Sequence, residues 1–207
     1  MTTAPESPSR LRRVELHRLA LALAWATVAY NAVEAVVAIW AGSAADSLAL
    51  VSFGGDSIVE CLSALAVIWQ FRGDVPEDRE RQALKAIAVA FFALAGYVTV
   101  DAARSLLVGA DPEASTVGIV LAVASLVVMP VLTWAKRRVG RELGSATVTA
   151  DSVQTLLCTF LSGVLLVGLV LNATLDWSWA DPLAALVIAA VAVNEGRHAW
   201  RGDDCCD

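Results

Sequence analysis

The chain has 207 residues, of which 57% are hydrophobic and 17% charged, and its formal net charge at pH 7 is −6. A mean hydropathy of +0.65 is too high for a soluble domain, whose surface needs more polar side chains, so the sequence indicates an integral membrane protein. The acidic balance offers no basic face to nucleic acid and excludes that class of partner. Membrane lipid is an expected partner.

Six apolar stretches are long enough to cross a membrane as helices, because about 20 residues span roughly 30 Å of hydrocarbon. They cover residues 19–40, 45–71, 84–107, 116–134, 148–171 and 180–200. The predicted fold class is therefore an all-α integral membrane protein, a bundle of six transmembrane helices. Since the connections are short, we expect a cytoplasmic segment (1–18), one transmembrane domain (19–200) and a short acidic tail (201–207).

Basic residues occur almost only in alternate connections. The N-terminal segment, the connection after the second stretch, the connection at residues 135–147 and the tail contain them, and Lys136 belongs to this set. Because short cytoplasmic loops retain Arg and Lys, both chain ends are predicted to be cytoplasmic. Most of the basic residues are arginine, which favours a GC-rich bacterial source, so we expect a multi-pass protein of a bacterial inner membrane.

The second stretch contains two acidic residues, Asp56 and Glu60, near its middle. Residues four apart lie on one face of a helix, about one turn from each other. An ionised carboxylate at the bilayer centre costs about 2.5–3.5 kcal/mol on insertion scales. Two such neighbours repel unless a cation or a proton lies between them. The pair indicates a metal or proton site; the alternative is two neutral carboxyl groups hydrogen-bonded to neighbouring helices.

The fifth stretch repeats the arrangement with Asp151, Gln154 and Cys158 on one face. Since the second and fifth spans run in opposite directions, the two polar faces are expected to meet at similar depth. Carboxylates, an amide oxygen and a thiolate would form a site for a divalent ion of borderline softness such as zinc, with manganese, cobalt, cadmium and ferrous iron left open. The alternative for Gln154 and Cys158 is simple packing between helices.

Four further polar residues lie in or at the start of the spans. Asn31 and Glu34 share one face of the first span and are expected either to line an ion path or to form a hydrogen bond between helices. Asp46 and Asp181 stand where the second and sixth spans begin. The helix dipole favours a carboxylate there, so we expect each to cap its own helix.

Several short motifs together resemble the membrane domain of the cation diffusion facilitator (cation efflux) family. They are Ala41-Gly42-Ser43, Ser47-Leu48-Ala49, Asp56 to Glu60, Ala150-Asp151 and Ala180-Asp181-Pro182. The resemblance extends over residues 19–200. It implies an acid pair on the second helix, matched by Asp56 and Glu60, and a His or Asp followed four residues later by Asp on the fifth. Gln154 and Cys158 stand at those last two positions, which is a departure from the family pattern.

The resemblance also implies a homodimer, although we do not expect here the cytoplasmic domain that usually follows the sixth span in the family. In its place is a tail with Cys205 and Cys206 among three acids, which is expected either to collect metal or to be an acidic terminus. The four cysteines suggest no disulfide framework.

The expected function is a divalent metal transporter that exports Zn²⁺ or a similar ion in exchange for protons. Its site would comprise Asp56, Glu60, Gln154, Cys158 and Asp151. No prosthetic group and no enzyme activity are expected, because no nucleophile and base stand at compatible spacing. The alternatives are a metal-binding or sensing protein of the same fold without transport, and an accessory membrane subunit whose polar residues only hold helices together.

Overall fold

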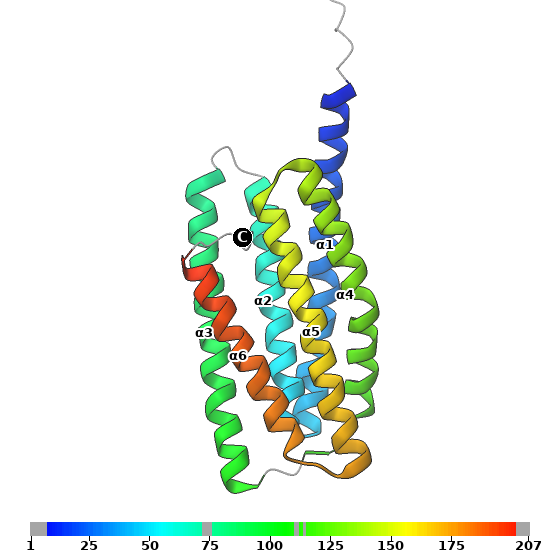
Figure 1. Cartoon of the computed structure of the whole chain (residues 1–207), viewed down its shortest axis with the longest axis vertical. Coiled ribbons are helices and arrows are strands. Elements are labelled where there is room, and N and C mark those ends of the chain that lie inside the picture. Colours follow the sequence, from blue (N-terminus) through cyan, green and yellow to red (C-terminus); the bar gives the residue numbers. More distant parts are fainter. Residues whose placement is uncertain (1–7, 72–75, 110–111, 114, 202–207) are drawn as a thin grey trace, which may run out of the picture.

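The computed structural model describes residues 8–71, 76–109, 112–113 and 115–201. Its six helices are α1 (Pro8–Ala44), α2 (Leu48–Phe71), α3 (Pro76–Val108), α4 (Thr116–Leu143), α5 (Ala146–Leu175) and α6 (Ala180–Arg201). They run along one long axis, with α1 and α4 on one side, α3 and α6 on the other, and α2 and α5 between them (Figure 1). This arrangement confirms the predicted all-α membrane bundle. Cys205 and Cys206 lie outside the described residues.

Five helical segments of the described chain are long and apolar enough to cross a membrane. They are Arg12–Ala44, Leu48–Phe71, Ala88–Leu107, Thr116–Leu143 and Asp151–Leu175. The sixth helix, α6, has 22 residues and is more polar near its end, where Glu195, Arg197 and Arg201 occur. It packs chiefly against α3 and also against α2 and α5, so the sixth predicted span forms a helix of the same bundle.

The helices extend beyond the predicted spans. The connection predicted at residues 135–147 reduces to Gly144 and Ser145, because α4 continues to Leu143 and α5 begins at Ala146. Gly144 adopts a φ of 64°, which ends α4, and the Ser145 hydroxyl accepts a hydrogen bond from the Val148 N–H and caps α5. Charged residues such as Arg, Lys and Glu are good helix formers. A charged stretch therefore limits the apolar part of a helix without ending the helix.

Many polar side chains are buried inside the bundle beside an apolar core, while other large apolar side chains face outward. Buried polar residues lie mainly on α1, α2, α4 and α5 and include Thr27, Ser57 and Ser125. Large aliphatic side chains cover the outside, for example Val36 at 70% and Val100 at 72% exposed. Exposed aliphatic groups suit a hydrocarbon solvent, in which polar groups must find partners inside the protein.

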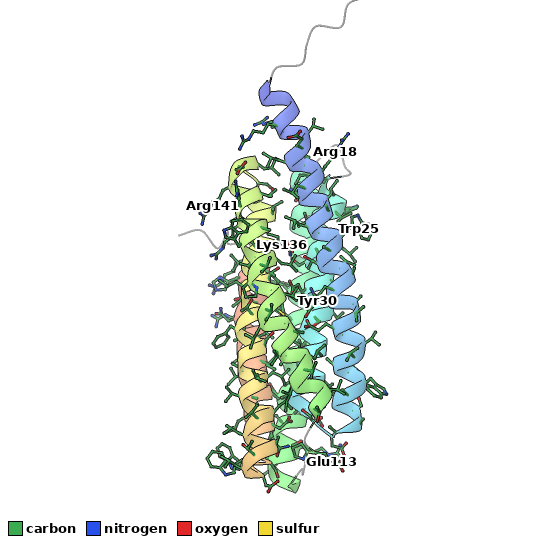
Figure 2. The ribbon with its side chains drawn as sticks, turned by 90° about the vertical axis from the view of Figure 1, so that its right-hand side faces the viewer. Arg18, Trp25, Tyr30, Glu113, Lys136 and Arg141 are labelled. Atoms are coloured by element: carbon green, nitrogen blue, oxygen red, sulfur yellow. The ribbon has the colours of Figure 1, made fainter. Side chains whose placement is uncertain are left out.

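The end of the bundle that holds the first, third and fifth connections is joined by hydrogen bonds. The Glu113 N–H donates to the Ala45 carbonyl at 2.8 Å, and the Asn172 side-chain amide donates to the Pro112 carbonyl at 2.7 Å. We call this end the base; Glu113 marks it in Figure 2. The base thus links α5 and the turns before α2 and α4.

Apart from Arg104, near the end of α3 at the base, the basic residues lie toward the opposite end, where Figure 2 labels Arg18 and Arg141. At this basic end the Arg12 guanidinium pairs with the Glu142 carboxylate at 2.9 Å and connects α1 to α4. A cavity of about 870 Å³ lies between the two helices, and Arg12 and Glu142 are among its lining residues. Basic residues gathered at one end are what the predicted orientation requires, and that orientation stays a prediction.

Candidate functional site

The acid pair of α2 lies inside the bundle. Asp56 is 3% exposed and Glu60 is fully buried, one helical turn further on. Close packing of α2 on α1 fixes this segment, because a Cβ on Gly54 would meet the Ile39 side chain at 2.7 Å. Neither carboxylate oxygen of Glu60 has a hydrogen-bond partner among the described residues. A buried carboxylate without a partner is unfavourable as an anion, so this position is suited to receiving a cation or a proton.

Cys158 brings α5 against the acid pair. Its thiol is 1% exposed, lies next to Glu60 and is within electrostatic range of Asp56. The polar faces of α2 and α5 therefore meet at these three residues. Gln154, one turn before Cys158, is only half-buried. In the part of the chain that the structure describes, no three His, Cys, Asp or Glu side chains converge closely enough to hold a metal ion, so ligation stays a prediction.

Glu34 of α1 extends the acidic cluster. It is 1% exposed, and its Oε2 accepts a hydrogen bond from the Ser57 hydroxyl of α2 at 2.9 Å. Its other carboxylate oxygen has no partner in the described structure. Glu34 also lies within electrostatic range of Glu60 and close to Tyr30, which Figure 2 labels. Of the two uses expected for Glu34, the hydrogen bond between helices is present, and its position beside Glu60 keeps the ion-path interpretation open.

Glu195 of α6 was not among the residues singled out from the sequence. It is half-buried and within electrostatic range of Asp56. Its neighbours Arg197 and Arg201 made this stretch resemble a solvated helix end. The one available signal was its position on a helix beside apolar turns, which is too common to identify a site.

Asp151 forms a buried ion pair with Lys136, which sequence reasoning had assigned to a basic loop. The Lys136 ammonium lies 2.7 Å from Asp151 Oδ2, and the two side chains are 2% and 3% exposed. Lys136 is therefore not a cytoplasmic loop residue. It lies on the inward face of α4, at the spacing of Met129 and Thr133, which are also buried. Figure 2 places Lys136 between the levels of Arg141 and Tyr30.

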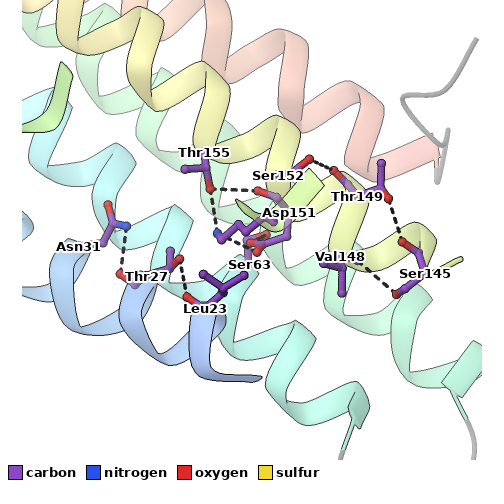
Figure 3. A network of polar contacts seen from close by, with 11 residues as sticks. Leu23, Thr27, Asn31, Ser63, Ser145, Val148, Thr149, Asp151, Ser152 and Thr155 are labelled. Carbon is purple, nitrogen blue, oxygen red and sulfur yellow. Dashed lines mark hydrogen bonds and ion pairs between the residues drawn. The ribbon is translucent and has the colours of Figure 1, made fainter. Parts of the chain in front are cut away.

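Hydrogen bonds hold both partners of this ion pair. The Lys136 ammonium also donates to the Thr155 hydroxyl at 2.8 Å, and Thr155 donates to the Asp151 carbonyl at 3.1 Å. The Ser63 hydroxyl of α2 donates to Asp151 Oδ1 at 3.3 Å. Figure 3 shows Ser63, Asp151 and Thr155 gathered in this network. Side chains of α2, α4 and α5 thus meet in it, one turn from Glu60.

The start of α2 is capped by residues other than those expected. Ser47 is the N-cap, since its hydroxyl accepts a hydrogen bond from the Leu50 N–H at 3.2 Å. Asp46 is exposed and adopts a φ of 49° before the helix begins. The Asp181 carboxylate accepts hydrogen bonds from the Ser47 hydroxyl and from the Ala49 N–H, the latter at 3.1 Å. The expectation that Asp46 and Asp181 cap their own helices was therefore wrong, because Asp181 caps α2 from the first turn of α6.

Comparison with known proteins agrees with this architecture. Residues 84–201, more than half of the chain, match the cation efflux transmembrane domain. An uncharacterized transporter of the cyanobacterium Synechocystis is 26% identical over 193 residues, a match that covers 87% of this chain. The chain spans 62% of the length of that relative. By the extent of the domain match, this chain belongs to the cation efflux family.

Proposed function

We propose that this chain carries a divalent transition-metal cation across a membrane and that Asp56 and Glu60 provide its first ligands. The observation that carries the proposal is Glu60, a fully buried carboxylate with two unpartnered oxygens one turn from a second buried carboxylate. Two neighbouring carboxylates favour a doubly charged cation, which offsets the repulsion between them. Membership of the cation efflux family supports the same function.

Zn²⁺ is the proposed ion. Cys158 lies next to Glu60, and a thiolate beside carboxylates favours a metal of borderline softness over magnesium or calcium. Gln154 and Asp151 complete the set of five candidate ligands, although Asp151 is already bound to Lys136. A movement of α5 against α2 would be needed to bring three donors onto one ion.

Proton exchange follows from the ligand chemistry. Carboxyl and thiol groups must lose their protons to bind a metal, so loading of the site releases protons and unloading takes them up. We further propose export from the cytoplasm of a bacterium across its inner membrane, with the chain acting as a homodimer and without enzyme activity.

Transport by purified protein in proteoliposomes tests the proposal. We expect Zn²⁺ uptake driven by a pH gradient in the wild type, and its loss in Glu60→Gln and Asp56→Asn, which remove charge but keep shape. Glu15→Gln is the matched control, because Glu15 is exposed on the N-terminal part of α1. Retained uptake in both site variants would overturn the site. Metal binding without uptake in the wild type would instead indicate a metal-binding protein. If the wild type showed neither binding nor uptake, an accessory subunit would be indicated.

A further inference from the structure

We infer that Lys136 withholds Asp151 from the transported cation and thereby determines which ions the site accepts; this inference rests on the proposed function above. A lysine ammonium is a cation attached to the protein. In this structure the Lys136 ammonium pairs with the buried Asp151 carboxylate and makes no ion pair with the neighbouring Glu60 carboxylate.

The ion pair satisfies both of its members. Lys136 binds Asp151 Oδ2 at 2.7 Å and Thr155 at 2.8 Å, and Ser63 binds the second carboxylate oxygen. Such a pair is retained inside a membrane protein because each charge would otherwise be unpaired in a medium of low dielectric constant. A metal ion that used Asp151 as a ligand would have to displace the ammonium and leave it without a counter-ion.

Glu60 presents the opposite situation. It is as deeply buried as Asp151 and lies within electrostatic range of both Asp151 and Lys136. The Thr155 hydroxyl and the Cys158 thiol lie close to it, but neither makes a well-formed hydrogen bond to its oxygens in the described structure. One carboxylate of this neighbourhood is therefore neutralised by a residue of the chain, and the other is available to an ion from outside.

The pairing of Asp151 with Lys136 determines which donor groups the site offers to a metal ion. Without Asp151 the donors next to Glu60 are Asp56 and the Cys158 thiol, and Gln154 is a further candidate on the same face of α5, a mixed set that favours zinc or cadmium. With Asp151 released, a third carboxylate would join them and shift the preference toward manganese, which prefers oxygen donors. Lys136 is thus a specificity-determining residue that binds no ion itself.

Losing Asp151 would have a different effect. The Lys136 ammonium would then have no counter-ion, and the Glu60 carboxylate lies within its electrostatic range. A tethered ammonium on Glu60 competes with every divalent ion. Asp151→Asn should therefore weaken metal binding indirectly, by releasing Lys136.

Ion selectivity of the full chain in proteoliposomes tests the first consequence. Lys136→Met removes the charge and keeps the length of the side chain, and it should raise the ratio of Mn²⁺ to Zn²⁺ transport efficiency several-fold, because a released third carboxylate favours the ion that prefers oxygen donors. Lys136→Met combined with Asp151→Asn has no released carboxylate and should regain the wild-type ratio. Lys136→Arg retains the charge and should keep it. Equal ratios in the wild type and in Lys136→Met would overturn the inference.

A rescue experiment decides the matter if Lys136→Met does not fold. Asp151→Asn should weaken Zn²⁺ binding about tenfold, and adding Lys136→Met to it should restore the affinity, because the competing ammonium is gone. A double variant as weak as Asp151→Asn, or no weakening in Asp151→Asn, would overturn the inference. Absence of both transport and binding in the wild type would overturn the proposed function itself, a result visible without any variant.

Discussion

The Asp181 carboxylate caps the start of α2, so replacing Asp181 with asparagine should lower the free energy of unfolding by an amount that follows from its hydrogen bonds. The carboxylate is 2% exposed and accepts hydrogen bonds from the Ser47 hydroxyl and from the Ala49 N–H. A hydrogen bond to a charged group contributes about 1.5–3 kcal/mol to stability. Asparagine retains one carbonyl oxygen and no charge. One bond is lost and the other weakened, so the free energy of unfolding should fall by about 2–3 kcal/mol.

Asp46→Asn is the matched control, since Asp46 has the same side chain at the other position expected to cap a helix. It is exposed, and asparagine tolerates its left-handed conformation, so the free energy of unfolding should change by less than about 0.5 kcal/mol. Unfolding of the purified chain in mixed detergent micelles, followed by circular dichroism, measures both variants. Equal losses in the two variants, or no loss in Asp181→Asn, would refute the assignment of the α2 cap to Asp181.

Two further predictions concern α4 and α5. Gly140→Ala should destabilise the chain by about 1–3 kcal/mol, because the added Cβ would meet the Thr149 hydroxyl of α5 at 2.8 Å. Gly163→Ala is the control, since a Cβ there would meet no atom of another helix within 4 Å. It should stabilise the chain by about 0.4–1 kcal/mol in the same unfolding measurement. In a variant whose other cysteines are serine, Zn²⁺ but not Mg²⁺ should slow maleimide labelling of Cys158, since a coordinated thiolate no longer attacks. This protection should vanish with Asp56→Asn, and labelling unaffected by any metal would mean that Cys158 only packs.

The sequence predicted the features that depend on local pattern. Apolar length identified the helices, and the four-residue spacing of Asp56 and Glu60 identified a shared face that the structure buries. Both inferences use the geometry of a single helix, which a sequence carries in full. The resemblance to the cation efflux family, based on short motifs, agrees with the domain match over residues 84–201.

The features that the sequence did not predict depend on contacts between helices. Lys136 stands beside Arg137 and Arg138, a pattern typical of loop charge, although α4 buries Lys136 while Arg137 is half-buried and Arg138 is exposed. The buried Met129 and Thr133 precede it by seven and three residues, the spacing of one helix face, and this was the signal available. Asp181 offered no comparable signal, because its partners lie more than 130 positions away.

The base of the bundle has a mechanical consequence. Hydrogen bonds join Glu113 to Ala45, Asn172 to Pro112 and Asp181 to the start of α2, so all three connections at that end form one unit. When helices are joined at one end, a rotation between them changes their separation least at that end and more with distance from it. We therefore expect any relative movement of the helices to be smallest at the base, where these hydrogen bonds join the connections.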